Sequence, residues 1–190
     1  AVLLNTALED AELHVNAQAP AVAGSALEAL ARKYMEVQAI IKRWSRRYDD
    51  RLLEQLIYMP EVSVSDFDRI DWLRAWAHEL NTRLNVLDDG TRTFLVEVKA
   101  GADPQSSRIL VHKTEHGSLS NKFLPREFFE SAEYQRIADL ARTLAGLMGE
   151  GAFARRGSDQ HEIGSFKEAM RWLFEQARKG QSIQRYKGLG

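Results

Sequence analysis

The stretch from Thr91 to Leu124, TRTFLVEVKA GADPQSSRIL VHKTEHGSLS NKFL, decides the fold class of this chain. Over residues 91–100 the apolar side chains Phe94, Val96 and Val98 recur at every second position, which is the period of a strand. Turn sequences follow at 101–104 and at His116-Gly117, and each leads into a further apolar run, over 108–114 and over 119–124. The stretch therefore predicts a three-stranded antiparallel β-meander.

Helical periodicity dominates the residues before this meander. Ser25–Glu28 has the pattern of a capping box. Apolar residues then alternate three and four positions apart, at Leu27, Leu30, Tyr34, Val37, Ile41, Trp44 and Tyr48. This narrow stripe predicts a long helix that packs on a neighbouring helix. A short helix over 51–58, ended by Pro60, and a second long helix over 65–88 are expected next, the latter as the antiparallel partner of the first.

The two ends of the chain have weaker patterns. Residues 2–15 are interpreted as two short strands around a turn at Glu9-Asp10, although their Ala and Leu residues suit a helix equally well. A linker is expected over 16–24. After the meander, a helix is predicted from Pro125 to Met148, a loop over 149–164, and a last helix from the capping box Ser165–Glu168 to Gly180. Helices and strands are thus segregated along the chain, which predicts an α+β fold with long helices in antiparallel pairs and a small antiparallel β-meander.

Composition removes several classes of protein. Apolar residues make up 44% and charged residues 28% of 190 residues, which excludes collagen-like and wholly disordered chains. The sequence contains no cysteine, so disulfide scaffolds, thiolate zinc sites and cysteine nucleophiles are excluded. With 26 Lys and Arg against 27 Asp and Glu, contact with nucleic acid would require a local basic patch. No apolar run is long enough to suggest a membrane span.

The search for catalytic or metal-binding residues finds weak signals. Asp66-Phe67-Asp68 resembles a two-carboxylate magnesium site, but it begins a predicted helix, where acidic residues are favoured by the helix dipole. His112 and His116 would lie too far apart on a strand to share one ion. Ser158, Asp159 and His161 crowd one loop and cannot form the side-chain relay of a catalytic triad. We therefore predict no catalytic, cofactor-binding or metal site in this chain.

Basic residues are the stronger signal. Residues 42–51 contain five basic and two acidic residues. Lys42, Arg43, Arg46 and Arg47 would share one side of a helix and could follow a phosphate backbone, although cations near a helix C-terminus also complement its dipole. A second group, Arg178, Lys179, Arg185 and Lys187, follows near the end of the chain. The candidate DNA-binding residues are Lys42, Arg43, Arg46, Arg47, Arg185 and Lys187.

The last seven residues, Gln184-Arg185-Tyr186-Lys187-Gly188-Leu189-Gly190, form the most specific string of the sequence. This string resembles the QRYKGLG sequence of the B subunits of bacterial DNA gyrases, ATP-dependent type IIA topoisomerases. Further upstream, Leu13–Asn16, Arg46–Tyr48, Glu54–Tyr58 and Glu133–Ile137 are similar to the insert that Gram-negative gyrases carry before that string. The resemblance covers essentially the whole chain.

The resemblance implies a division of the chain. Residues 1–183 would be an insert-like domain, helical over 25–88 and 125–180 with the meander over 91–124, and residues 184–190 would begin the return to the TOPRIM region. The chain is expected to be a piece of a larger, cytoplasmic protein. Asp66 and Asp68 do not match the metal-binding D-x-D residues of that region, so that role is not transferred to them.

The resemblance also implies a function. The parent enzyme would use ATP and Mg²⁺ to supercoil double-stranded DNA as a heterotetramer with the gyrase A subunit. Its ATP-binding residues and metal triad belong to other segments, and the cleaving tyrosine to the A subunit. The insert would support DNA binding and communication between the B and A subunits, with no cofactor of its own. The alternative is a scaffold that contacts only protein, whereas an independent hydrolase is the least supported hypothesis.

Overall fold

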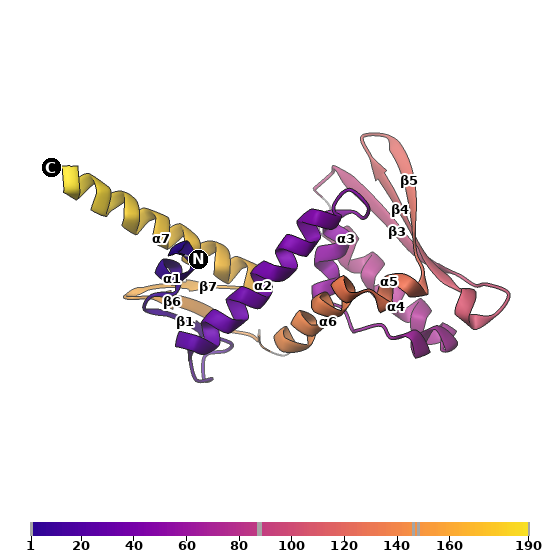
Figure 1. Ribbon diagram of the computed structural model, residues 1–190, viewed down its shortest axis with the longest axis horizontal. Helices are drawn as coiled ribbons and strands as arrows, with labels where there is room; N and C mark the ends of the chain where they lie inside the picture. Colours follow the sequence, from indigo (N-terminus) through magenta and orange to yellow (C-terminus); the bar gives the residue numbers. More distant parts are fainter. Residues whose placement is uncertain (1, 87–88, 146, 148, 190) are drawn as a thin grey trace. The chain divides into compact units, whose positions relative to one another are not determined.

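The structure is a computed structural model that describes residues 2–86, 89–145, 147 and 149–189 (Figure 1). The chain divides into two compact units, one formed by Ala1–Glu36 with Thr143–Gly190 and the other by Val37–Arg142. Each unit contains helices and one antiparallel sheet, so the predicted α+β class is confirmed. No helix in the described ranges is both long and apolar enough to cross a membrane.

The sheet of the second unit is the predicted meander. Its strands are β3 (Arg92–Lys99), β4 (Arg108–Glu115) and β5 (Ser118–Leu124), in the order β3-β4-β5. Lys99 pairs with Arg108 at one end and Arg92 with Glu115 at the other, so the register is unbroken. His116 and Gly117 both have positive φ, 52° and 78°, as a tight two-residue hairpin requires. A 3₁₀ turn, η3 (Pro104–Ser106), closes the other connection.

Helix α4 (Ile70–Val86) covers the outer edge of β3. The Phe94 amide donates to Asn85 Oδ1 (3.1 Å), and Asn85 Nδ2 donates to the Phe94 carbonyl (2.9 Å). The Val96 amide donates to Asn81 Oδ1 at 2.8 Å. Two asparagines thus satisfy backbone groups that an uncovered edge strand would leave unpaired. The helix begins later than predicted, because residues Val64–Asp68 form a 3₁₀ turn (η2); the predicted last stripe residue, Leu87, lies outside the described residues.

Helix α2 (Gly24–Trp44) carries the predicted apolar stripe. The stripe residues from Leu27 to Ile41 are buried, at Leu27, Leu30, Tyr34, Val37 and Ile41. The helix ends at Trp44, one turn before the predicted Tyr48. Helix α3 (Asp50–Gln55) and the 3₁₀ turn η1 (Leu56–Tyr58) follow, which confirms the short helix predicted before Pro60.

An aromatic cluster fills the core of the second unit. The predicted helix from Pro125 is divided into α5 (Arg126–Glu130) and α6 (Ala132–Leu144), because Ser131 is extended with ψ at 149°. Met148, the predicted end, lies outside the described residues. Phe129 packs edge-to-face on Tyr134, with ring centroids 4.9 Å apart, and also contacts Phe67 and Trp76. The Val62 amide donates to Tyr134 Oη at 2.9 Å, and burial raises the pKa of Tyr134 to about 12.

The first unit corrects two predictions. Residues Val2–Leu8, predicted as a strand, form helix α1. Residues 149–164, predicted as a loop, contain strands β6 (Phe153–Arg156) and β7 (Asp159–Glu162), joined at Gly157 with φ of 61°. They complete a sheet with β1 (Ala11–His14) and β2 (Val22–Ala23), in the order β2-β1-β6-β7. The β1–β6 pairing joins opposite ends of the chain, so no local pattern could reveal it.

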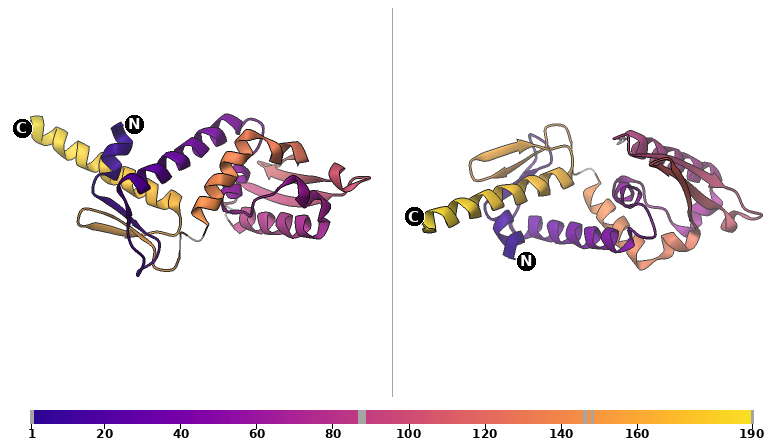
Figure 2. Two further views of the ribbon diagram at one scale, coloured as in Figure 1. Left: turned by 60° about the horizontal axis from the view of Figure 1, so that its bottom comes forward. Right: turned by 90° about the horizontal axis from the view of Figure 1, so that it is seen from above.

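Helix α7 (Phe166–Leu189) corrects a third prediction, because it continues through Gly180 instead of ending there (Figure 2). Its start is as expected: the Glu168 amide donates to Ser165 Oγ (3.1 Å), and the Gly164 amide donates to Glu168 Oε2 (2.9 Å). One glycine inside a helix costs about 1 kcal/mol relative to alanine, which a helix packed on α1 and β6 can tolerate.

Candidate nucleic-acid interface

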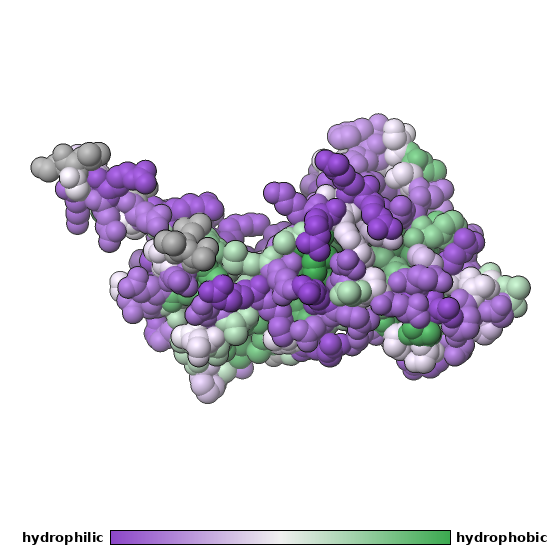
Figure 3. Space-filling view, viewed as in Figure 1, coloured by the Kyte–Doolittle hydropathy of each residue, from purple (hydrophilic) through white to green (hydrophobic). Residues whose placement is uncertain are grey.

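The first predicted basic group lies where α2 ends. Lys42 and Arg43 are in the last turn of α2, and Arg46 and Arg47 are in the turn that follows it. The prediction that all four share one helical face is therefore wrong, because the amides of Arg47 and Tyr48 both donate to the Trp44 carbonyl and close the helix. All four side chains are exposed. We call Lys42, Arg43, Arg46 and Arg47 the basic turn; hydrophilic side chains cover the end of α2 in Figure 3.

Aromatic side chains hold the basic turn on the core. Tyr48 packs edge-to-face on Phe128 with ring centroids 4.9 Å apart, and Trp44 lies 5.5 Å from Tyr48 and 5.7 Å from Phe128. Phe128 in turn packs on Phe129, 5.0 Å away. Offset and edge-to-face aromatic pairs of this kind add stability beyond the area that they bury. The turn therefore has a defined position within its unit, although its cations point into solvent.

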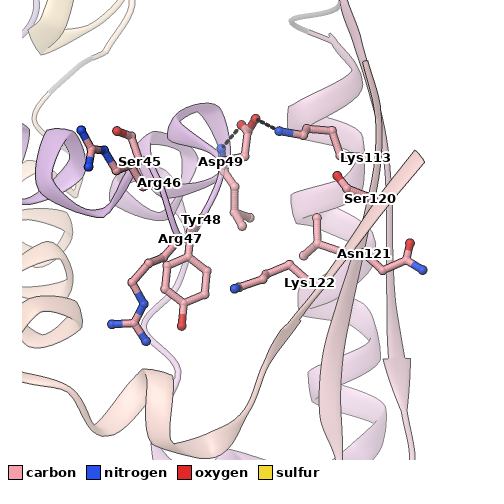
Figure 4. Close-up of a pocket in the computed structure, with 11 residues that line it drawn as sticks. Ser45, Arg46, Arg47, Tyr48, Asp49, Lys113, Ser120, Asn121 and Lys122 are labelled. Carbon is pink, nitrogen blue, oxygen red and sulfur yellow. Dashed lines mark hydrogen bonds and ion pairs between the residues drawn. The ribbon is translucent and has the colours of Figure 1, made fainter. Parts of the chain in front are cut away.

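A hollow of about 210 Å³ opens between this turn and the meander (Figure 4). One wall is formed by Arg47, Tyr48 and Asp49, and the other by Lys113 of β4 with Ser120 and Lys122 of β5. Figure 4 shows Arg47 and Lys122 on opposite sides of Tyr48, whereas the guanidinium of Arg46 points away. The Cζ of Arg47 lies 5.7 Å and the Nζ of Lys122 lies 5.2 Å from the centroid of the Tyr48 ring.

Lys122 was not among the residues predicted from the sequence. It lies opposite Val111 in the β4–β5 register, and Ser120 lies opposite Lys113, so Lys122 and Ser120 share one face of the sheet. Val111 on this face is buried. A lysine in register with a core valine was the available signal, because a polar residue at such a position marks where the core ends.

The acid in this hollow, Asp49, is fully engaged. Its Oδ1 accepts from the amides of Arg51 (2.8 Å) and Leu52 (3.2 Å), which caps α3. Its Oδ2 accepts from Arg92 Nη1 (3.1 Å) and Lys113 Nζ (3.2 Å), and the side chain is 7% exposed. Burial opposes the charge of Arg92, but a hydrogen bond to Asp50 and the charges of Asp49, Asp50 and Glu115 raise its pKa. Lys113 is also paired with Glu115 at 3.5 Å.

The remaining cations of this surface have no such partner. Within the described part of the chain, no acidic group lies in ion-pair distance of Lys42, Arg43, Arg46, Arg47 or Lys122. Arg47 and Lys122 lie over the faces of aromatic rings. The geometry thus presents uncompensated positive charge beside polar hydroxyl groups, an arrangement suited to an anion.

The second predicted group is in a different setting. Arg185 and Lys187 lie in the last part of α7, in the other unit, and are exposed. Their neighbours Ile183 and Tyr186 are 56% and 81% exposed, although both have large apolar surfaces. Arg185 and Lys187 are thus a separate basic segment of the first unit and are not among the residues that line the hollow.

The weak metal and catalytic signals have structural roles. Asp66 is buried and accepts hydrogen bonds from the Ser63 amide (2.7 Å) and from Arg69, so that its pKa is lowered although burial opposes this. Asp68 accepts from Gln105 Nε2 at 2.7 Å. His161 stacks on Trp172 with ring centroids 5.7 Å apart. Among the described residues, no group of three His, Asp or Glu side chains could hold a metal ion.

His112 is part of a ladder across the meander. Its Nε2 lies 3.0 Å from Glu97 Oε1 and its Nδ1 lies 2.7 Å from Asn121 Oδ1, one partner on each neighbouring strand. Hydrogen bonds to Glu97 and Asn121 raise the pKa of His112. The ladder lies on the sheet face opposite Lys122, since Asn121 precedes it in the strand.

Comparison with known protein families shows to which family the chain belongs. Residues 11–177 match the DNA gyrase B subunit insert domain. The matched range includes both sheets, the basic turn and the hollow, and it ends before the gyrase-like string at 184–190. The sequence resemblance is thereby confirmed over most of the chain. The chain belongs to the family of DNA gyrase B subunit insert domains.

Proposed function

We propose that this chain supports the binding of double-stranded DNA by gyrase, and communication between its B and A subunits, during ATP-dependent supercoiling in the cytoplasm. The observation that carries the proposal is the basic turn, whose four exposed cations have no acidic partner in the described residues. Family membership supplies the context, because the parent enzyme acts on DNA. The chain acts as an accessory module; ATP and Mg²⁺ belong to other parts of that enzyme.

The test replaces cations of the basic turn in the assembled enzyme. The triple variant Arg43→Gln, Arg46→Gln, Arg47→Gln is expected to weaken duplex binding. It should also make the slope of log K against log salt concentration shallower by about 0.9 per lost phosphate contact, and by up to roughly 2.7 for three. The loss should be the same for duplexes of different sequence, because contacts to phosphate carry no base information. Circular dichroism and urea melts should show that folding changes by no more than a few tenths of a kcal/mol.

A matched variant, Arg185→Gln with Lys187→Gln, tests the second basic segment in the same assay. A reduced salt dependence in this variant, together with none in the triple variant, would move the DNA contact from the basic turn to α7. If both variants bind DNA like the parent enzyme at every salt concentration, the proposed DNA contact is wrong.

The alternative is a scaffold that contacts only protein. The exposed side chains Ile183 and Tyr186 on α7 favour it, because apolar groups at a helix end are often buried by a partner. This alternative expects that Ile183→Ser with Tyr186→Ser weakens assembly of the enzyme while the salt dependence of DNA binding stays unchanged, since hydrophobic docking responds little to salt.

A further inference from the structure

The hollow beside Tyr48 combines two cations from segments far apart in the sequence. Arg47 follows α2 and Lys122 lies on β5, yet both approach the same ring, at 5.7 Å and 5.2 Å from its centroid. Attraction to the ring face stabilises each cation but leaves its charge uncompensated. A ligand with several negative charges, reaching both sides of the ring, would balance both cations.

The acids of the neighbourhood cannot supply that anion. Asp49 uses both carboxylate oxygens on the cap of α3, on Arg92 and on Lys113. Glu115 is paired with Arg92 (3.2 Å) and Lys113 (3.5 Å). Lys113 is therefore neutralised from within the chain, whereas Arg47 and Lys122 are left to an external ligand.

The size and the chemistry of the hollow indicate which anion. Its volume of about 210 Å³ lies below the range of roughly 300–1,000 Å³ that is usual for pockets of drug-sized ligands. Ser120 lines the same wall as Lys122 and offers a hydroxyl donor (Figure 4). A phosphate group accepts several hydrogen bonds and carries the negative charge that would balance Arg47 and Lys122.

The ligand must also be reachable from solvent. Arg47 and Lys122 are exposed, while the ring between them is held by Trp44 and Phe128. The two cations are thus presented on a rigid support that a long, charged surface can approach. Such contacts suit a nucleic-acid backbone better than a free nucleotide, for which the described lining offers no base-binding cleft.

We infer that this hollow binds the phosphate backbone of duplex DNA, with Arg47 and Lys122 as charged ligands on the two sides of Tyr48 and Ser120 as a hydroxyl donor. The inference rests on the proposed function and adds a strand of the meander to the DNA contact. It makes β5 part of the interface, which the basic turn alone does not require.

The test uses the assembled gyrase that contains this chain and a fluorescently labelled linear duplex, titrated at several salt concentrations. Lys122→Gln should reduce the salt dependence of binding by about 0.9 log units, which corresponds to roughly an eightfold loss of affinity near 0.1 M salt. Lys122→Arg should restore both the salt dependence and the affinity of DNA binding. Lys99→Gln is the matched control, because Lys99 lies on the same sheet but is paired with Glu97 at 3.2 Å, outside the hollow.

The outcomes separate this inference from the proposed function. If the triple arginine variant reduces the salt dependence and Lys122→Gln does not, the phosphate site in the hollow is wrong while the proposed function stands. If neither variant reduces it, the phosphate site in the hollow is wrong, and the proposed DNA contact then depends on the result for the variant Arg185→Gln with Lys187→Gln. If Lys122→Gln weakens assembly with the A subunit and leaves DNA binding unchanged, the hollow binds an acidic protein segment, and the inference is overturned.

Discussion

The two basic segments of this chain carry exposed cations on different supports. The basic turn lies on an aromatic cluster and faces a second cation on β5 across Tyr48. The end of α7 carries Arg185 and Lys187 on a helix whose neighbouring residues Ile183 and Tyr186 are exposed. The comparison teaches that charge density alone does not define a binding site. A site also needs packing that holds the charges where an anion can use them.

The largest expected effect on the free energy of unfolding concerns the aromatic cluster on which the basic turn packs. Phe129→Ala removes a ring that is 1% exposed and contacts Phe67, Trp76, Phe128 and Tyr134. It should lower the free energy of unfolding by about 3–5 kcal/mol, because it leaves a cavity in the cluster. Ile183→Ala, on exposed α7 surface, is the matched control and should change it by less than about 0.5 kcal/mol. Urea melts measure both, and equal losses would abolish the distinction between the two segments.

An intermediate effect on the free energy of unfolding is expected at Asp49, which joins the basic turn to α3 and the meander. Asp49→Ala removes the cap of α3, and Asp49→Asn keeps an acceptor for the amides of Arg51 and Leu52. The alanine variant should therefore be less stable than the asparagine variant by about 1 kcal/mol. Both lose the charge that faces Arg92 and Lys113, so neither should reach the stability of the parent. Equal stability of the two variants would show that the cap contributes nothing.

The smallest expected effect on the free energy of unfolding concerns the ladder of Glu97, His112 and Asn121 on the other face of the meander. The pKa of His112 is raised, so its charged form stabilises the fold fully below its unfolded value near 6.5, and this contribution is lost as the pH rises through the folded value. The stability difference between the parent and His112→Gln should therefore be larger at acidic than at alkaline pH. Urea melts across this range test it, with His78→Gln on the exposed face of α4 as control. A difference that grows with pH would contradict the ladder.

Much of the fold was predictable because its patterns are local. The alternation at Phe94, Val96 and Val98 determines a strand, and His116-Gly117 determines the hairpin that follows, since both signals act between neighbours in the chain. The stripe from Leu27 to Ile41 determines a helix for the same reason. The string Gln184–Gly190, together with the segments Leu13–Asn16, Arg46–Tyr48, Glu54–Tyr58 and Glu133–Ile137, was sufficient to indicate the gyrase B family.

The tertiary structure decided what depends on distant partners. Residues 149–164 become a hairpin because β6 pairs with β1, and Gly180 stays helical within a helix that packs on α1 and β6. The position of Lys122 beside Arg47 is of the same kind, because register and helix termination, acting far apart in the chain, bring two cations to one ring. A sequence specifies which groups can carry charge, whereas the folded chain specifies which charges meet and which of them lack a partner.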